Sequence, residues 1–85
     1  MNRVYLFGKL VYKSKLKYNI LTKLNIYTEL VIETSSGDMF QCIIDENNLD
    51  KVKRLNTTNF VYIIGSGFVV NDLFYVIVKN IWIFS

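Results

Sequence analysis

Alternating apolar and polar positions predict that this chain is built mainly of β-strands. The segment 3–11 shows the pattern most clearly, and its core-facing set is Val4, Leu6, Gly8 and Leu10. The opposite, outward-facing set is Arg3, Tyr5, Phe7 and Lys9. A glycine inside a strand marks a bend or a bulge. We therefore expect this strand to bend and to continue through residues 12–18.

The remaining pattern predicts further strands and one helix. We expect strands at about 24–34, 39–44, 60–70 and from 73 nearly to Ser85, with turns at 19–23, 35–38 and 71–72. The helix is expected over 45–56, because acidic residues occupy its first turn and basic residues lie toward its end. Its apolar stripe is narrow and consists of Leu49, Val52 and Leu55. Such a stripe can close one end of a barrel.

This order of three strands, a helix and two strands predicts an all-β fold in one domain over residues 1–85. With a bent first strand it is the arrangement of the OB fold, a five-stranded Greek-key barrel with one short α-helix between strands 3 and 4. Apolar residues make up 52% of the sequence. That share gives so short a chain the dense core that it needs.

The sequence lacks the histidine and the paired cysteines that several common catalytic and metal sites require. It has no histidine and one cysteine, which excludes a His-based triad, a structural zinc site and an internal disulfide. Cys42 is expected to act as a small buried hydrophobe. Glu29 and Glu33 would share a strand face about 13 Å apart, too far for a glycosidase carboxylate pair. We expect no catalytic residue, no metal site, no cofactor and no enzyme activity.

Membrane and export signals are also missing from the pattern. No apolar run approaches the roughly 18–20 residues of a membrane helix. The first residues run directly into strand-like sequence, without a signal-peptide pattern. We expect a soluble, cytoplasmic protein with no membrane partner.

Positive charge is concentrated in the amino-terminal third. Residues 1–23 carry six bases and no acid, whereas the rest carries four bases and seven acids, for a net charge of +3. If residues 12–18 are extended, their lysines share one face about 6.6 Å apart, close to successive phosphates of a nucleic-acid strand. A basic groove with interleaved tyrosines is what single-stranded nucleic acid requires. The candidate contacts here are Lys9, Lys13, Lys15, Lys17, Tyr12 and Tyr18. The alternative is that these lysines only protect an edge strand from aggregation.

Two further aromatic residues fall on the predicted second and third strands, the face that OB folds usually present to oligonucleotides. Tyr27 has Asn25 and Glu29 as neighbours in phase, which favours an outward position. Phe40 lies in a segment that is apolar on both phases, so either a binding face or the core can hold it. We include both as candidate stacking residues.

The outward side of the first strand carries a second candidate surface. Arg3, Tyr5 and Phe7 form an amphipathic stripe that suits either a dimer interface or a nucleic-acid contact. Trp82 lies between two isoleucines and is expected to point outward, which is typical of a partner surface.

Several of these segments resemble bacterial single-stranded-DNA-binding proteins and the related primosomal protein B. Residues 1–10 are similar to the opening Asn-Arg/Lys-Val-x-Leu-x-Gly-x-Leu run of that family. Residues 16–18, 40–44 and 60–65 resemble its Leu-Arg-Tyr segment, its third strand and its Val-x-Val-x-Gly fourth strand. The resemblance spans nearly the whole chain. It implies an OB fold, binding of single-stranded DNA and a dimer formed by pairing of the first strand with its copy.

The sequence also departs from the family. The long DNA-wrapping hairpin between strands 4 and 5 is reduced to about Asn71-Asp72, without its aromatic residue. An aromatic residue expected six positions beyond Phe40 is replaced by Glu46. The acidic tail that recruits replication proteins in the family does not follow the last strand. We expect a minimal relative with lower affinity, closer in form to primosomal protein B.

The predicted function is sequence-tolerant binding of single-stranded DNA in replication, recombination or repair, by a homo-oligomer that is most simply a dimer. Replication proteins are the expected protein partners. RNA is an alternative ligand, because no residue pattern in the sequence distinguishes a 2′-hydroxyl. The alternative is an OB-fold interaction subunit of a larger complex with weak or no nucleic-acid binding.

Overall fold

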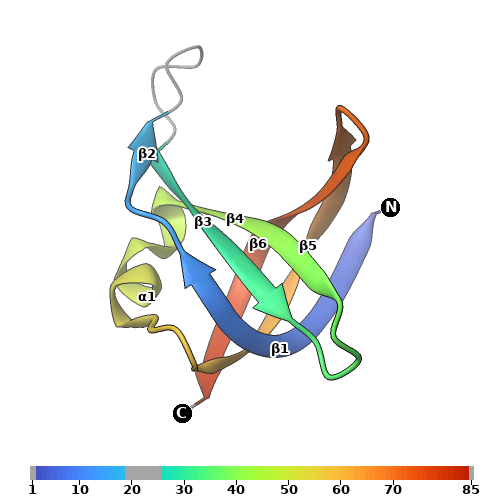
Figure 1. Ribbon diagram of the computed structural model, residues 1–85. Coiled ribbons are helices and arrows are strands. Elements are labelled where there is room, and N and C mark those ends of the chain that lie inside the picture. Colours follow the sequence, from blue (N-terminus) through green and yellow to red (C-terminus); the bar gives the residue numbers. More distant parts are fainter. Residues whose placement is uncertain (1, 19–25, 85) are drawn as a thin grey trace.

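The computed structural model describes residues 2–18 and 26–84, which form a β-barrel with a short helix beside it (Figure 1). The strands are β1 (Arg3–Lys13), β2 (Lys17–Tyr18), β3 (Ile26–Glu33), β4 (Met39–Asp45), β5 (Phe60–Val70) and β6 (Leu73–Phe84). A 3-10 turn, η1 (Glu46–Asn48), and a helix, α1 (Leu49–Arg54), lie between β4 and β5. The predicted turn at 19–23 and the start of the predicted second strand lie outside the described residues.

The barrel is closed by the long, curved first strand (Figure 1). The strand order is β1-β5-β6-β4-β3-β2, and an additional β1–β3 pairing joins the two sides. Residues 3–9 of β1 pair with β5, and residues 9–13 pair with β3. All pairings are antiparallel except the parallel pairing of β4 with β6. This is the predicted OB-fold Greek-key barrel, with its helix between the third and fourth long strands.

One buried cluster of aliphatic side chains fills the barrel. Its members are Leu6, Leu10, Leu30, Ile32, Cys42, Ile44, Val52, Leu55, Val61, Ile63, Val76, Val78 and Ile81. The inward set predicted for the first strand is confirmed, with Val4 packed at the edge of the cluster. Gly8 lies where β1 turns toward β3, and a Cβ there would collide with the backbone oxygen of Glu33. Glycine therefore permits the close approach that closes the barrel.

The prediction of a continuous strand through residues 12–18 was wrong. The chain leaves the strand at residues 14–16 and returns to it only for β2. Buried Ser14 causes the break, because its backbone nitrogen donates to the Glu29 oxygen and its Oγ accepts from the Glu29 nitrogen, each at 2.9 Å. These bonds tie the end of β1 to the middle of β3.

The helix is shorter than the predicted range of 45–56. Asp45 ends β4 opposite Tyr27, and its Oδ1 accepts the backbone N–H of Asn47 in the turn that follows. Helix α1 ends at Arg54, and Leu55 is already extended. The expected apolar stripe is confirmed for Val52 and Leu55, which are buried in the barrel cluster.

Lys13 holds the carboxyl end of this helix against the barrel. Its Nζ donates hydrogen bonds to the backbone oxygens of Val52 and Leu55, at 2.7 and 3.0 Å. The Val52 oxygen also accepts the backbone N–H of Leu55, so Lys13 gives it a second donor at the end of the helix. Lys51 attaches the same helix to β6 through a 3.1 Å bond to the oxygen of Ile81.

Replacing Lys13 with Met is expected to lower the free energy of unfolding by about 1–2 kcal/mol, since two hydrogen bonds to a charged donor are lost. Urea denaturation measures this change. The exposed Lys15→Met is the matched control and should leave stability almost unchanged. Equal effects of the two substitutions would contradict the structural role of Lys13.

Candidate nucleic-acid interface

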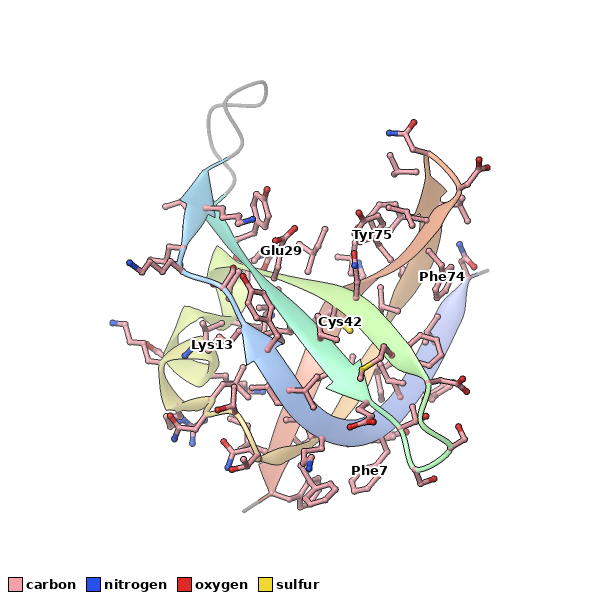
Figure 2. The ribbon with its side chains drawn as sticks, viewed as in Figure 1. Phe7, Lys13, Glu29, Cys42, Phe74 and Tyr75 are labelled. Carbon is pink, nitrogen blue, oxygen red and sulfur yellow. The ribbon has the colours of Figure 1, made fainter. Side chains whose placement is uncertain are left out.

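A hollow opens on the outside of the barrel where β1, β3, β4 and β6 meet. Its volume is about 140 Å³, and it is lined by Tyr12, Glu29, Leu30, Val31, Gln41, Cys42 and Tyr75. Tyr12 lies opposite Val31 on β3, and Val31 lies opposite Gln41 on β4. Gln41 in turn lies opposite Tyr75 on β6. In Figure 2, Glu29 lies on the side of β2 and β3. Tyr75 lies across from it, on the side of β5 and β6.

Aromatic rings stand at both ends of this row of residues. Tyr12 is 50% exposed at the end of β1. Tyr75 is half-buried and stacks on Phe68 of β5, with ring centroids 5.5 Å apart and planes inclined by 21°. Rings held in this way can stack on unpaired bases without further ordering, which is how sequence-tolerant sites bind them.

Sequence reasoning chose Tyr12 but did not choose Tyr75 or Phe68 for the site. Their place beside the hollow depends on the parallel pairing of β4 with β6, which joins strands far apart in the chain. No local pattern specifies that pairing. The segment 73–78 is apolar or aromatic at every position, so the sequence offers no alternation that would place Tyr75 on an outward face.

An ion pair lies at the edge of the hollow. Lys17 Nζ donates to Glu29 Oε1 at 2.6 Å, and the two side chains are 45% and 36% exposed. The hydrogen bond to Glu29 raises the pKa of Lys17 above its ordinary value. Lys17 therefore stays charged at neutral pH but already has an anionic partner.

The predicted single row of three lysines is not formed. Lys13 turns toward α1, as described above, and Lys17 turns toward Glu29. Lys13 and Lys15 instead join Lys53 of the helix at a groove of about 550 Å³ between residues 13–16 and α1. Sequence reasoning missed Lys53, because only the docking of the helix brings it there. Lys9 is half-buried and lies opposite both Glu33 and Phe60.

The other candidate aromatic residues occupy different environments. Tyr27 is half-buried on β3, and its strand neighbours are Lys17 and Asp45. Tyr18 lies in β2 opposite Ile26. Phe40 packs against the barrel cluster and meets Phe74 edge to face, with centroids 6.4 Å apart, so the core alternative describes its position.

A second surface covers the outside of β1, β5 and β6. This surface, called here the aromatic face, consists of Tyr5, Phe7, Phe60, Tyr62, Trp82 and Phe84. Tyr5 and Phe7 are 59% and 55% exposed, and Trp82 is exposed as predicted. Phe7 contacts the rings of Phe60 and Phe84, with centroids 6.0 and 6.1 Å apart. Exposed aromatic residues in such numbers are typical of a surface that binds another protein.

The aromatic face borders a strand edge. Within the described part of the chain, residues 3–8 of β1 pair on one side only, with β5, because pairing with β3 starts at Lys9. Arg3 lies at the exposed start of this edge. The backbone groups of such an edge can pair with another strand.

The described residues offer neither a reactive thiol nor a cluster of metal ligands. Cys42 is buried as predicted, and burial raises the pKa of its thiol to about 12, which disfavours the thiolate. In residues 2–18 and 26–84, no group of three or more His, Cys, Asp or Glu side chains is placed to hold a metal ion. No helix in those ranges is long and apolar enough to cross a membrane.

Comparison with known proteins relates the chain to others by fold. No protein-family model matches the sequence. No curated protein matches it either. Solved structures do match, and seven of them have sequence identities of 8–20%.

Three of these structures illustrate the similarity. The single-stranded-DNA-binding domain of a Synechococcus protein has a TM-score of 0.82 and 14% identity, over 95% of this chain and 93% of that one. The dimeric amino-terminal domain of PriB from Thermoanaerobacter tencongensis has a TM-score of 0.76 and 20% identity, over 99% and 97%. The Plasmodium falciparum single-stranded-DNA-binding protein, solved with single-stranded DNA, has a TM-score of 0.73 and 14% identity, over 100% and 96%. The chain thus has the OB fold found in single-stranded-DNA-binding proteins and in PriB.

Proposed function

We propose that this protein binds single-stranded DNA with little sequence preference, across the hollow between Tyr12 and Tyr75. The observation that carries the proposal is the pair of accessible tyrosines at the two ends of one row across β1, β3, β4 and β6, one of them backed by Phe68. The fold supports it, since similar structures are described as single-stranded-DNA-binding proteins and one holds single-stranded DNA. The biological role that fits is DNA replication, recombination or repair, in contact with replication proteins.

Stacking supplies most of the affinity in this account. A base stacked on an aromatic side chain contributes about 1–3 kcal/mol, so two or three such contacts suffice for micromolar binding. Every base has a flat face, which makes the binding tolerant of sequence. The exposed amide of Gln41 lies between the two tyrosines in the strand row and can both donate to and accept from a base edge.

Phosphate contacts then come from the rim of the hollow and from the groove beside α1. Lys15 and Lys53 line that groove, and Lys17 lies at the rim. Lys9, in the middle part of β1, and Tyr27, near the start of β3, are further candidate contacts. Lys13 contributes positive charge to the groove but is already bonded to the helix. Each phosphate neutralised should steepen the fall of affinity with salt.

Removal of either ring, in Tyr12→Ala or Tyr75→Ala, is expected to weaken binding of oligothymidylate about tenfold, because a stacking surface is lost. Fluorescence anisotropy of a labelled oligonucleotide at low salt measures the change, and a salt titration adds the phosphate contribution. Tyr62→Ala is the control, as this tyrosine lies outside the hollow and contacts the ring of Trp82, with centroids 5.6 Å apart. Saturable binding that neither substitution weakens would refute the site. No saturable binding of single-stranded DNA or RNA by the folded protein would refute the function.

We also propose that the protein forms a homodimer through the free edge of β1. The support is the unpaired edge over residues 3–8, the exposed Tyr5 and Phe7 beside it, and the dimeric state given for the PriB domain of similar fold. Two such edges can extend one sheet across a two-fold axis.

Introducing a charge at this interface, in Phe7→Glu, is expected to convert the dimer to a monomer, because it buries an unpaired carboxylate. Light scattering after size-exclusion chromatography gives the mass of each species. Met39→Glu is the matched control, since Met39 is 58% exposed and lies on β4 rather than on the strand with the unpaired edge. A monomeric wild-type protein, or a Phe7→Glu protein that stays dimeric, would contradict the proposal.

The extent of the aromatic face favours a second candidate function. It continues beyond Tyr5 and Phe7, which lie on the strand with the unpaired edge, to the exposed Trp82 and Phe84 of β6. A protein-interaction subunit would use it to dock in a larger complex. This alternative predicts that the hollow substitutions change nothing and that the folded protein does not bind nucleic acid.

A further inference from the structure

The charge inside the hollow is opposite to the one expected of a phosphate site. Among the described residues that line it, Glu29 alone is charged, and the others are apolar, aromatic or amide side chains. Figure 2 shows the Glu29 carboxylate across from Tyr75. The only ion-pair partner identified for this carboxylate in the described ranges is Lys17, at the rim.

The backbone fixes where this carboxylate lies. Glu29 pairs with Ile43 of β4 on one side, and on the other its N–H and C=O are both bonded to Ser14. Ser14 is 7% exposed, so these hydrogen bonds lie in the packed part of the barrel where β1 meets β3. The Glu29 carboxylate is therefore attached to a position of β3 that is held by neighbouring backbone on both sides.

A phosphate and a base would meet different conditions in the hollow. A phosphate would lie next to a like charge, and the nearby cation, Lys17, is already paired at 2.6 Å. Bases would meet the ring of Tyr12 or that of Tyr75, which stand at opposite ends of the strand row, and a carboxylate that accepts hydrogen bonds from base N–H groups. The hollow thus disfavours the backbone of a nucleic acid and favours its bases.

We propose that Glu29 determines specificity for unpaired bases: its carboxylate keeps phosphate out of the hollow and leaves Tyr12 and Tyr75 to a base. This inference rests on the proposed function. In a duplex the bases are paired and stacked, so the phosphates reach the hollow first. A single strand can turn its bases inward and its phosphates toward the lysines at the rim and beside α1.

The test compares the affinity for single-stranded oligothymidylate with that for a duplex of equal length, by anisotropy at about 50 mM salt, where phosphate contacts are strong. Glu29→Gln keeps the size of the side chain and removes its charge. It is expected to tighten duplex binding about fivefold and single-strand binding by less than about twofold, since one repulsion is removed. The ratio of the two affinities then falls at least about threefold.

Glu33→Gln is the matched control. Glu33 lies on the same outward side of β3, lines a different hollow with Phe7 and Lys9, and gives the same change in net charge. It should alter both affinities by the same small factor. Lys17→Gln separates the two members of the ion pair: it removes the cation, keeps the carboxylate and should preserve the preference for single strands.

The outcomes distinguish this inference from the proposed function. A wild-type protein that binds no single-stranded DNA overturns both. Wild-type binding with an unchanged ratio in Glu29→Gln, or an equal fall in the ratio in Glu33→Gln, overturns only the role of Glu29. A ratio that falls in Lys17→Gln as much as in Glu29→Gln also overturns it, because the ion pair rather than the carboxylate would then set the preference.

Discussion

The seam between β1 and β3 is the constraint on which the rest of the structure depends. It requires Gly8, where any side chain would strike the backbone of Glu33, and it is locked further along by the two hydrogen bonds between Ser14 and Glu29. Without this seam the sheet would stay open and the aliphatic cluster would lose one wall. The seam also brings Tyr12 beside β3 and fixes the position of Glu29. The contacts between β1 and β3 that close the barrel therefore also form the hollow.

Much of the fold could be predicted because the first strand alternates clearly, the later apolar runs are of strand length, and the turns carry clear signals. The bent first strand, the hairpin turn at 35–38, the tight turn at Asn71-Asp72 and the outward Trp82 follow from local sequence. The break at Ser14 does not, because it depends on a hydrogen-bond partner fifteen residues away in sequence. The alternation of lysines and tyrosines through 12–18 resembles a strand, and the buried serine interrupts it.

The candidate site was less predictable, for a related reason. The spacing of Lys13, Lys15 and Lys17 predicts a row of cations on one face, but only the folded chain supplies the partners of two of them. These are the end of α1 for Lys13 and Glu29 for Lys17. Tyr75 and Phe68 enter the site through a parallel strand pairing that leaves no local trace. Sequence patterns indicate which side chains point outward. Which of them become neighbours is decided by long-range register.

The central claim is that the hollow between Tyr12 and Tyr75, and not the aromatic face, holds single-stranded DNA. Backbone amide shifts from nuclear magnetic resonance, recorded during titration with a short oligothymidylate, test it most directly. The account predicts that the largest changes cluster at Tyr12, Val31, Gln41 and Tyr75. Changes confined to Tyr5, Phe7, Tyr62 and Trp82 would contradict it and would place the ligand on the aromatic face instead.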